Sequence, residues 1–344
     1  MTMHVRCVRA GLKGWGGVGA MAVVCALALA FVLLLPTARS SGDGSTGTGG
    51  PGFATATHAK DTTCEGPEKQ TLAPSGADGP TITAIKNRQG EKRKLIVGVD
   101  LNSYRWGYRD PNRADAELEG FDIDLVRRIA QDILGDPEAV QFKAIPTNQR
   151  IPAIQDGRVD MVVRTMTITC DRADKVAFSA PYFKTGQTVL APKSSRISGY
   201  NDTLADKKVC TAAGSTAYLK LKKDRDTGAM PASVDIIPPV PNQLDCLVRL
   251  QLGEADAVVN DGALAASQAA QDPTVGLKGK AFTTEYYGVA MNKKADDLVR
   301  RVNQILVEYR ANGWQASYDR WLSATLGQDA SASKPPAPQY LRTS

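Results

Sequence analysis

Apolar and polar positions along the chain follow two rhythms, one typical of buried strands and one typical of amphipathic helices. The run LIVGV at 95–99 is short, apolar and bounded by charged residues, which predicts a buried strand. The run FDIDLVRRIAQDIL at 121–134 carries apolar side chains at helical spacing and is followed by Gly135, which predicts a helix with a glycine stop. A buried strand followed by an amphipathic helix is the repeating unit of α/β proteins.

The same alternation continues through the chain. Strand, short helix and strand are expected at 140–145, 150–157 and 160–163, and the rhythm restarts after Pro192. Later strands and helices are expected in turn at 207–212, 215–223, 234–237, 246–253, 256–259, 286–291, 295–313 and 314–322. Two such sets predict two α/β lobes, and a single doubly wound sheet is the alternative. We expect lobe 1 at 84–191 and 285–326 and lobe 2 at 192–284.

Both ends of the chain differ in composition from this body. Residues 1–39 place basic side chains before an apolar run from Val18 to Leu35, which spans roughly 27 Å as a helix and predicts a signal peptide or a membrane anchor. Basic residues before that run indicate that the body lies outside the cytoplasm, tethered to or secreted across the cell membrane. Residues 40–83 are rich in Gly, Ser, Thr and Pro and predict a flexible stalk, and residues 327–344 predict a disordered tail.

Charge and histidine content exclude several classes of protein. The formal net charge is +6, and the basic residues are interleaved with acidic ones rather than with aromatic ones, which argues against nucleic-acid binding. The two histidines, His4 and His58, both precede the folded body, which therefore lacks the commonest metal ligand and general base. We expect neither a metal nor another cofactor.

The cysteines divide by position. Cys7 and Cys25 lie before or inside the N-terminal apolar run and are not expected to pair. The other four lie beyond it, an even number in an oxidising compartment: Cys64, Cys170, Cys210 and Cys246. Cys210 and Cys246 fall in one expected α/β unit and are the favoured pair, which leaves Cys64 with Cys170. Buried free thiols are the alternative.

The stretch GFDIDLVRRIA at 120–130 carries the first chemical motif. A glycine turn precedes Asp122 and Asp124, and carboxylates in a first helical turn favour the positive end of the helix. Residues two apart do not share a helical face, so a paired acid and base is not expected. Helix capping is the simple interpretation.

The same stretch resembles the signature of the family 3 extracellular solute-binding proteins, the amino-acid receptors of ABC importers. The resemblance runs from Leu95 to Leu326 through RIPAIQDGRVDMVV, TMTITCDR, VAFSAPYF, GSTAY, LQLGEADAVVND and YYGVAM to the tryptophan-bearing terminal helices. It implies a two-lobed periplasmic-binding-protein type II fold, in which two parallel or mixed sheets are joined by a double-crossover hinge. The lobes of such a protein close around a small ligand.

Residues 164–172 read RTMTITCDR, and alternate threonines of this kind are typical of a strand with one polar face. The resemblance implies that Thr165, Thr167 and Arg172 bind the α-carboxylate of an amino acid. A guanidinium takes a carboxylate in a two-bond fork, and hydroxyl groups satisfy its remaining lone pairs. Taken alone, the threonines indicate β-propensity, and the arginine fits a surface ion pair with Asp171 or Asp174.

Two further segments complete the expected clamp. The resemblance places Gly214, Ser215 and Thr216 at a helix start in lobe 2, where backbone N–H groups face the same carboxylate. It also makes Asp261 the acceptor for the α-ammonium group. An aspartate after an apolar strand is alternatively a helix N-cap for GALAASQ.

Selectivity for the ligand side chain is expected from five positions after predicted strands or at a helix start. Asp100 matches a position that faces the ligand side chain, and Tyr104 or Trp106 would supply an aromatic wall. Arg150 resembles the arginine that meets a side-chain carboxylate, although a solvated helix start is the alternative. Arg164 stands where the family usually has small residues. Two arginines against one aspartate favour glutamate, with glutamine and aspartate next.

The resemblance thus implies an extracellular amino-acid receptor that presents its ligand to an ABC importer permease. A membrane-anchored sensor that regulates a signalling partner is an alternative, since the N-terminus is anchor-like. A periplasmic dehydratase-like enzyme on the same fold is the rival from another class, and it lacks the histidine or free cysteine that acid–base chemistry commonly uses. A structural domain with a vestigial pocket is a third possibility.

Overall fold

The computed structural model of the chain describes residues 64–328 and 333–343. The predicted N-terminal anchor or signal peptide, the stalk up to residue 63, two of the cysteines and both histidines lie outside these ranges. The described residues belong to one compact unit. Within them, no helix combines the length and the apolar character that crossing a bilayer requires.

The first lobe is built on a five-stranded mixed sheet with the order β4-β1-β5-β14-β6. β1 (Leu95–Val99) runs parallel to β4 (Val140–Ala144) and β5 (Met161–Val162). β14 (Ala290–Met291) runs antiparallel to β5 and to β6 (Ala177–Phe178). Leu95, Val97 and Val99 of β1 are buried and Ile96 is half-buried, as expected for a strand covered on both faces.

α3 (Phe121–Leu134) has the bounds that the helical spacing predicts, and its apolar residues are buried except Leu134 at the end, which is half-buried. It follows Gly120, where φ is 128° and a Cβ would lie 2.4 Å from the Trp106 carbonyl oxygen, so only glycine fits this approach. The same lobe contains α2 (Pro80–Lys86), α4 (Arg150–Gln155), α5 (Cys170–Ala173), α9 (Asp296–Asn312), α10 (Trp314–Trp321), α11 (Ser323–Leu326), the 3₁₀ turns η1 (Pro67–Lys69), η2 (Gly90–Lys92) and η3 (Thr147–Gln149), and a hairpin of β2 (Asn102–Ser103) and β3 (Gly107–Tyr108).

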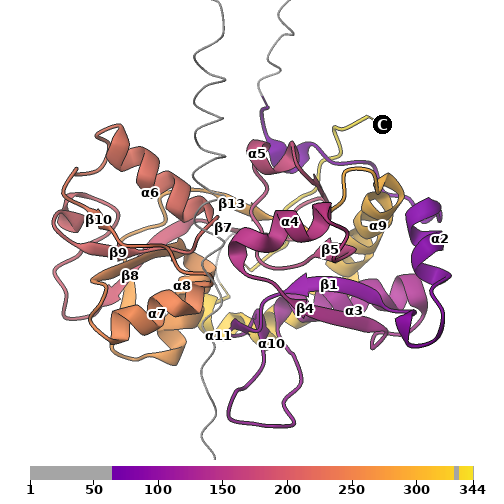
Figure 1. Cartoon of the computed structure of the whole chain (residues 1–344), viewed down its shortest axis with the longest axis horizontal. Helices are drawn as coiled ribbons and strands as arrows, with labels where there is room; N and C mark the ends of the chain where they lie inside the picture. The colour runs from indigo at the N-terminus through magenta and orange to yellow at the C-terminus, as the bar shows by residue number, and fades with distance from the viewer. Residues whose placement is uncertain (1–63, 329–332, 344) are drawn as a thin grey trace, which may run out of the picture. The chain divides into compact units, whose positions relative to one another are not determined.

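The second lobe has its own five-stranded sheet, with the order β10-β9-β11-β8-β12. Successive residues of its strands enter different apolar clusters, because side chains alternate between the faces of a sheet. Val209 packs in the cluster that contains Leu221 of α6, and Cys210 packs in the cluster that contains Leu247 of α7. Figure 1 shows α6 on one side of this sheet and α7 and α8 on the other. The elements are β8 (Gln187–Pro192), η4 (Asp202–Leu204), β9 (Lys208–Cys210), α6 (Thr216–Asp226), β10 (Asp235–Ile236), α7 (Gln243–Gln251), β11 (Ala257–Asp261), α8 (Gly262–Gln271) and β12 (Val275–Lys278).

Two antiparallel strands connect the lobes, β7 (Phe183–Thr185) and β13 (Glu285–Tyr287). Gly186 follows β7 directly, and a Cβ there would lie 2.2 Å from the Thr283 carbonyl oxygen. The close approach of these two crossing segments therefore requires glycine. Because β8 belongs to the second sheet, the crossing lies earlier in the chain than the expected boundary between 191 and 192.

Two expected strands take a different form. The segment 286–291 is divided between the hinge strand β13 and the lobe 1 strand β14, because it leaves one sheet and enters another. Thr165 and Thr167 do not continue β5 as an extended strand. Thr165 has φ 41°, and Thr167 forms only an isolated bridge with Tyr287.

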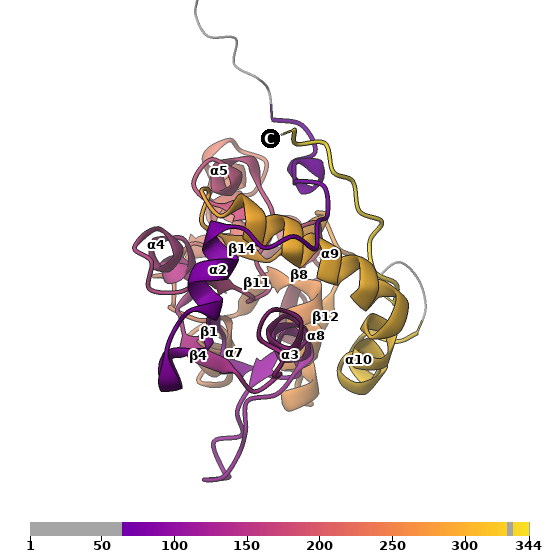
Figure 2. The same cartoon turned by 90° about the vertical axis from the view of Figure 1, so that its right-hand side faces the viewer.

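The described parts of the expected stalk and tail are ordered. Leu72 is fully buried, and α2 buries Ile82 and Ile85 against lobe 1. The C-terminal residues run beside the same segment: Leu341 N donates to Lys69 O and Arg342 pairs with Asp296. Figures 1 and 2 both show the C-terminal end beside the chain that leads into α2. Composition misled here, because a few apolar side chains docked on an existing lobe need no core of their own.

The structure contains both predicted disulfides. Cys64 bonds to Cys170 at the start of α5, which ties the first described residue to lobe 1. Cys210 bonds to Cys246 and joins strand β9 to helix α7 within lobe 2.

Candidate functional site

A loop between β5 and α5 carries the residues of the RTMTITCDR motif. Thr165 adopts a left-handed backbone conformation, and its N–H donates to the buried carboxylate of Asp122 at 3.1 Å. The other oxygen of Asp122 accepts from the Tyr182 hydroxyl at 2.8 Å. Burial raises the pKa of Asp122 to about 7, against the lowering effect of these two hydrogen bonds. Asp122 therefore fixes this loop rather than capping a helix on the surface.

Arg172 lies on the single turn of α5, whose N-cap Thr169 accepts from the Arg172 backbone N–H at 3.3 Å. Its guanidinium donates to the Thr167 carbonyl at 2.7 Å and to the Gly214 carbonyl of lobe 2 at 3.0 Å. Arg172 is buried, and no carboxylate forms an ion pair with it among the described residues. Burial lowers its pKa, and Asp261 acts in the opposite direction. The alternative of a surface ion pair is thus not what the structure shows.

The lobe 2 segment that meets Arg172 begins α6. Gly214 has φ 74°, and a Cβ there would lie 2.9 Å from the Cα of Asn148 in lobe 1, so the lobes approach closely at this glycine. Ser215 is the N-cap and accepts from the Tyr218 N–H at 3.0 Å. Thr216 follows and donates to Glu285 of the hinge strand at 3.2 Å.

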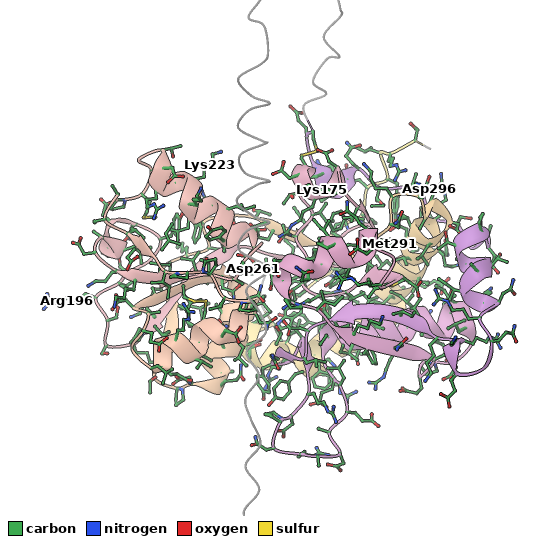
Figure 3. All side chains as sticks on the ribbon, in the orientation of Figure 1. Lys175, Arg196, Lys223, Asp261, Met291 and Asp296 are labelled. Carbon is green, nitrogen blue, oxygen red and sulfur yellow. A yellow bond between two sulfur atoms is a disulfide. The ribbon has the colours of Figure 1, made fainter. Side chains whose placement is uncertain are left out.

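Asp261 ends β11 at the junction of the lobes, where Figure 3 labels it. Its side chain makes no helix-capping bond and accepts instead from the Tyr287 hydroxyl at 2.6 Å. Burial and the nearby Glu285 raise the pKa of Asp261 to about 7, while Arg172 and Arg150 act to lower it. Asp261 and Arg172 thus perturb each other's pKa from different lobes.

Arg164 and Asp100 form a buried ion pair with 2.7 Å between Nη2 and Oδ2. The side chain of Arg164 is fully buried and also donates to Thr147 Oγ1 at 3.0 Å and to Asn242 Oδ1 of lobe 2 at 3.1 Å. Asp100 accepts in addition from the backbone of the residues that follow it and from the Ser103 hydroxyl. Its carboxylate is therefore occupied by the protein itself.

Arg150 is 3% exposed, which excludes the solvated helix start. Its guanidinium donates to the carbonyl oxygens of Thr147 and Arg164, at 2.9 Å and 3.1 Å. In the described part of the chain it forms no ion pair. Burial, with the neighbouring guanidiniums of Arg172 and Arg164, lowers its pKa well below the ordinary value. A carboxylate brought beside Arg150 would stabilise its charge.

A cavity of about 510 Å³ lies between α4, α5 and the start of α6. Four of the expected site residues line it, Arg150, Arg172, Gly214 and Thr216, whereas Asp100, Arg164, Thr165, Thr167, Ser215 and Asp261 do not. It is lined by Thr147, Asn148, Arg150, Ile151, Met166, Thr169, Asp171, Arg172, Lys175, Gly214, Thr216 and Leu219. Cations from lobe 1 and a helix start from lobe 2 thus face one space, which suits an anionic group of a small molecule.

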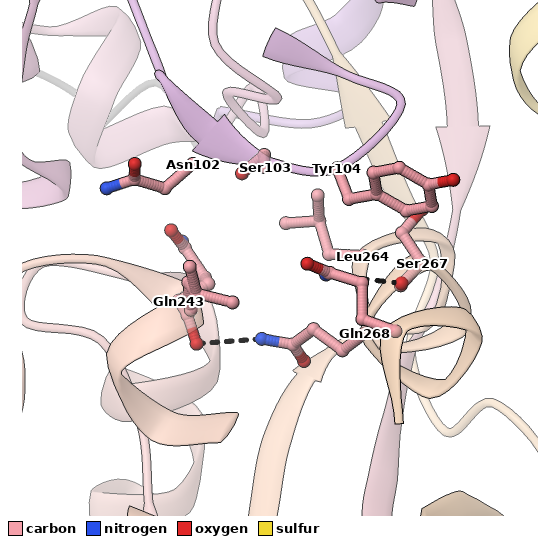
Figure 4. A pocket seen from close by; sticks show the side chains of 9 residues that line it. Asn102, Ser103, Tyr104, Gln243, Leu264, Ser267 and Gln268 are labelled. Carbon is pink, nitrogen blue, oxygen red and sulfur yellow. Dashed lines mark hydrogen bonds between the residues drawn. The ribbon is translucent and has the colours of Figure 1, made fainter. Parts of the chain in front are cut away.

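The two aromatic candidates do not line this cavity. Trp106 is fully buried among Phe121, Phe183 and Tyr287 in the core of lobe 1. Tyr104 borders a separate, very small pocket between the β2 hairpin and helices α7 and α8, shown in Figure 4. In this conformation neither ring forms a wall of the cavity that holds Arg172.

Several residues that shape the site carry no sequence signal of their own. Thr147, Asn242 and Tyr287 are ordinary polar or aromatic residues in the chain, and they become partners of Arg164 and Asp261 only through the fold. Glu285 lies on the hinge strand and accepts from Gln187 and Thr216. The GFDID motif contains Asp122, but from the sequence its aspartates suggest only helix capping. The bonds of Asp122 to Thr165 and Tyr182 could not be predicted from the motif.

Two α/β lobes joined by two crossing strands, with buried charges where they meet, define a bilobed binding protein. The sequence agrees: residues 95–324 match the bacterial extracellular solute-binding proteins, family 3. The chain belongs to this family, whose members are solute-binding receptors.

Two curated relatives illustrate the similarity. The chain is 34% identical to the ABC transporter glutamine-binding protein GlnH of Bacillus subtilis, over 70% of this chain and 84% of the relative. It is 28% identical to the glutamate-binding protein GluB of Corynebacterium efficiens, over 73% of this chain and 88% of the relative.

Solved structures agree with the fold. An ancestral arginine-binding protein bound to glutamine superposes with a TM-score of 0.59 at 33% identity, over 68% of this chain and 98% of the other. A solute receptor for L-cysteine from Neisseria gonorrhoeae gives a TM-score of 0.66 at 26% identity, over 75% of this chain and all of the other.

Proposed function

We propose that the protein is an extracytoplasmic receptor for a free amino acid, tethered or secreted through its N-terminal segment, which it presents to an ABC importer. One observation carries the proposal: a buried cation, Arg172, and a buried anion, Asp261, lie at the junction of two lobes and influence each other's pKa. An α-carboxylate and an α-ammonium group are the matching charges of a small zwitterion.

The roles follow from the geometry around each group. Arg172 and the hydroxyls of Thr165 and Thr167 would bind the α-carboxylate, helped by the backbone N–H of Thr216 at the start of α6. Asp261 would accept the α-ammonium group in place of the Tyr287 hydroxyl bond. Because these partners come from both lobes, binding would favour the closed arrangement.

The charged residues that do not bind the α-carboxylate or the α-ammonium group would select the ligand side chain. Asp100 is already paired with Arg164, whereas Arg150 contacts only carbonyl oxygens. A side-chain carboxylate would supply the anion that Arg150 lacks. We therefore propose glutamate as the preferred ligand over glutamine, with aspartate as a shorter candidate. The names of the relatives, glutamine-binding and glutamate-binding, are consistent with this class.

A thermal-shift screen tests the function. The full-length protein, purified in mild detergent, is heated with each of the twenty amino acids, because a ligand that binds only the folded state raises the melting temperature. Glutamate is expected to give the largest shift, at micromolar affinity, about −8 kcal/mol. Arg172→Ala should lose about 3–5 kcal/mol, since a buried carboxylate would be left unpaired. The absence of any shift, or normal affinity in that variant, would refute the assignment.

Arg150→Gln separates the two favoured ligands. The variant keeps a donor beside Thr147 but loses the charge, so glutamate binding should weaken much more than glutamine binding. Titration calorimetry with both ligands measures the difference. Equal losses would mean that Arg150 shapes the cavity without meeting a carboxylate.

A further inference from the structure

Arg164 and Asp100 close off part of the junction between the lobes. The guanidinium of Arg164 is fully buried and bonds to Asp100, to Thr147 and, across the junction, to Asn242. This ion pair lies where side chains of the two lobes meet. The guanidinium of Arg164 therefore takes the place beside the Asp100 carboxylate that a cationic group of a ligand could otherwise take.

Hydrogen-bond partners of Arg164 and of Asp100 line two different cavities. Thr147 lines the large cavity that contains Arg150 and Arg172. The second cavity is the pocket of about 10 Å³ in Figure 4, a space for roughly one water molecule. That pocket is lined by Ser103, which donates to Asp100, by Gln243, which follows Asn242 in the chain, and on its other side by residues of α8.

We infer that Arg164 is a specificity-determining residue that excludes amino acids with cationic side chains. Its guanidinium occupies the compartment in front of Asp100 that the side chain of arginine or lysine would otherwise enter. The inference rests on the proposed amino-acid binding and adds to it the class of ligand that the site rejects.

Electrostatics and space both support this role. Asp100 keeps its carboxylate oriented through the backbone N–H groups of Leu101 and Asn102 and the Ser103 hydroxyl, so it stays in place without the arginine. While Arg164 is present, a second cation would meet a guanidinium instead of a free anion, and like charges side by side disfavour binding. Arg164 also fills the space in front of Asp100, because its fully buried side chain lies 2.7 Å from that carboxylate.

The test compares Arg164→Ala with the wild type in the full-length protein. Calorimetry is run with L-glutamate, L-arginine and methylguanidinium, the last as a probe for the vacated compartment. The wild type should bind glutamate and neither cation. Arg164→Ala should bind arginine at least tenfold more tightly than the wild type does, and methylguanidinium should raise its melting temperature.

Three further variants make the result interpretable. Arg164→Ala with Asp100→Ala should lose both gains, because no carboxylate remains to receive the cation. Arg158→Ala, at an exposed arginine paired with Asp156, should behave like the wild type. If Arg164→Ala does not fold, Arg164→Gln keeps an amide donor for Thr147 and should show the same gain more weakly.

The outcomes separate this inference from the proposed function. A wild type that binds no amino acid overturns the proposed function, while the methylguanidinium arm still reports on the compartment at Asp100. A wild type that binds arginine as well as glutamate overturns the inference. So does a folded Arg164→Ala or Arg164→Gln variant that gains neither arginine nor methylguanidinium binding.

Discussion

Three buried arginines meet at the junction of the lobes, and their partners give each a different role. Arg164 has an anion of the protein beside it, at 2.7 Å. Among residues 64–328 and 333–343, Arg150 and Arg172 donate only to carbonyl oxygens, which satisfy hydrogen bonds but do not balance a charge. The site therefore holds two cations suited to two ligand carboxylates, and one cation already used.

The anion of the site should make binding depend on pH. The pKa of Asp261 is raised to about 7 by burial and Glu285, against Tyr287, Arg172 and Arg150. As the pH rises from the ordinary pKa of an aspartate through 7, ionisation of this carboxyl lowers the stability of the folded state. The ammonium group of a bound ligand offsets that loss. Between pH 8 and pH 6 the ionised fraction falls roughly tenfold, and affinity should fall with it. Calorimetry across this range measures the effect.

Two amide variants identify the titrating group. Asp261→Asn should bind the ligand weakly, and its affinity should not change between pH 6 and pH 8, since no charge remains to titrate. Burial also raises the pKa of Asp122 to about 7. Asp122→Asn should nevertheless keep the pH dependence of affinity, because Asp122 faces the loop at Thr165 and not the ammonium group of the ligand. If the pH dependence of affinity vanishes in Asp122→Asn and persists in Asp261→Asn, the titrating group is Asp122 and not Asp261.

At single positions the sequence predicts charge chemistry better than aromatic packing. Arg172 and Asp261 stand in motifs, and the structure brings them to one junction between the lobes. Of the two rings from which the sequence predicts an aromatic wall, Tyr104 or Trp106, Trp106 lies in the core of lobe 1. A tryptophan after a strand can lie either beside a ligand or in the core. Trp106 lies in the core because Phe121 and Phe183 pack around it, and these contacts cannot be predicted from the local sequence.

At the scale of elements, a helix and a loop cooperate. The first turn of α3 carries two aspartates with different partners: Asp122 holds the Thr165 N–H and the Tyr182 hydroxyl, whereas Asp124 accepts from Ser317 and Trp321 of the terminal helices. One carboxylate thus fixes the loop that carries Thr167, and the other fixes α10 to the lobe.

This pair offers a matched test of loop positioning. Asp122→Ala should weaken ligand binding at least tenfold, because the left-handed conformation at Thr165 loses the acceptor that holds it. Asp124→Ala should lower the melting temperature and leave the dissociation constant within about twofold. Asp122→Asn, which keeps an oxygen for the Thr165 N–H, should restore most of the affinity. If both alanine variants change only stability, Asp122 has no positioning role.

Regular elements were predictable where one periodicity extends far enough. The bounds of α3 follow from its apolar spacing, and β1 follows from a short buried run. The alternate threonines after the predicted strand at 160–163 are typical of a strand, but the buried carboxylate of Asp122 holds Thr165 in a loop. The segment 286–291 was predicted as one strand, and its two halves enter different sheets. Long-range contacts of this kind leave no local period.

At the scale of the molecule, the termini extend lobe 1. Thr71 donates to the Phe178 carbonyl and accepts from Asn303, and Arg342 N donates to Thr71 O. The segments around these residues are poor in apolar side chains, so composition predicts disorder. Their order comes from a few apolar side chains docked on the lobe, such as Leu72, from hydrogen bonds to the lobe and from the Cys64–Cys170 disulfide.

Movement between the lobes sets the last prediction. Arg164 donates to Asn242 across the junction, and Thr147 N donates to Pro241 O at 3.0 Å beside it. Separation of the lobes would break these bonds, so each one stabilises only the closed arrangement that a ligand shares. Asn242→Ser should keep the helix N-cap but not reach Arg164. Loss of a hydrogen bond to a charged group, about 1–2 kcal/mol, should speed ligand dissociation roughly tenfold.

Stopped-flow dissociation of glutamate measures this rate, and association should change little, because the bond forms only as the lobes close. Asn201→Ser is the matched control: Asn201 is an exposed N-cap of lobe 2 that accepts from the Thr203 N–H and does not contact lobe 1 through any described hydrogen bond. An unchanged dissociation rate in Asn242→Ser would mean that the Arg164–Asn242 bond does not report closure. A rise in both variants would indicate a general loss of lobe 2 stability, which places the cause in helix capping rather than at the junction.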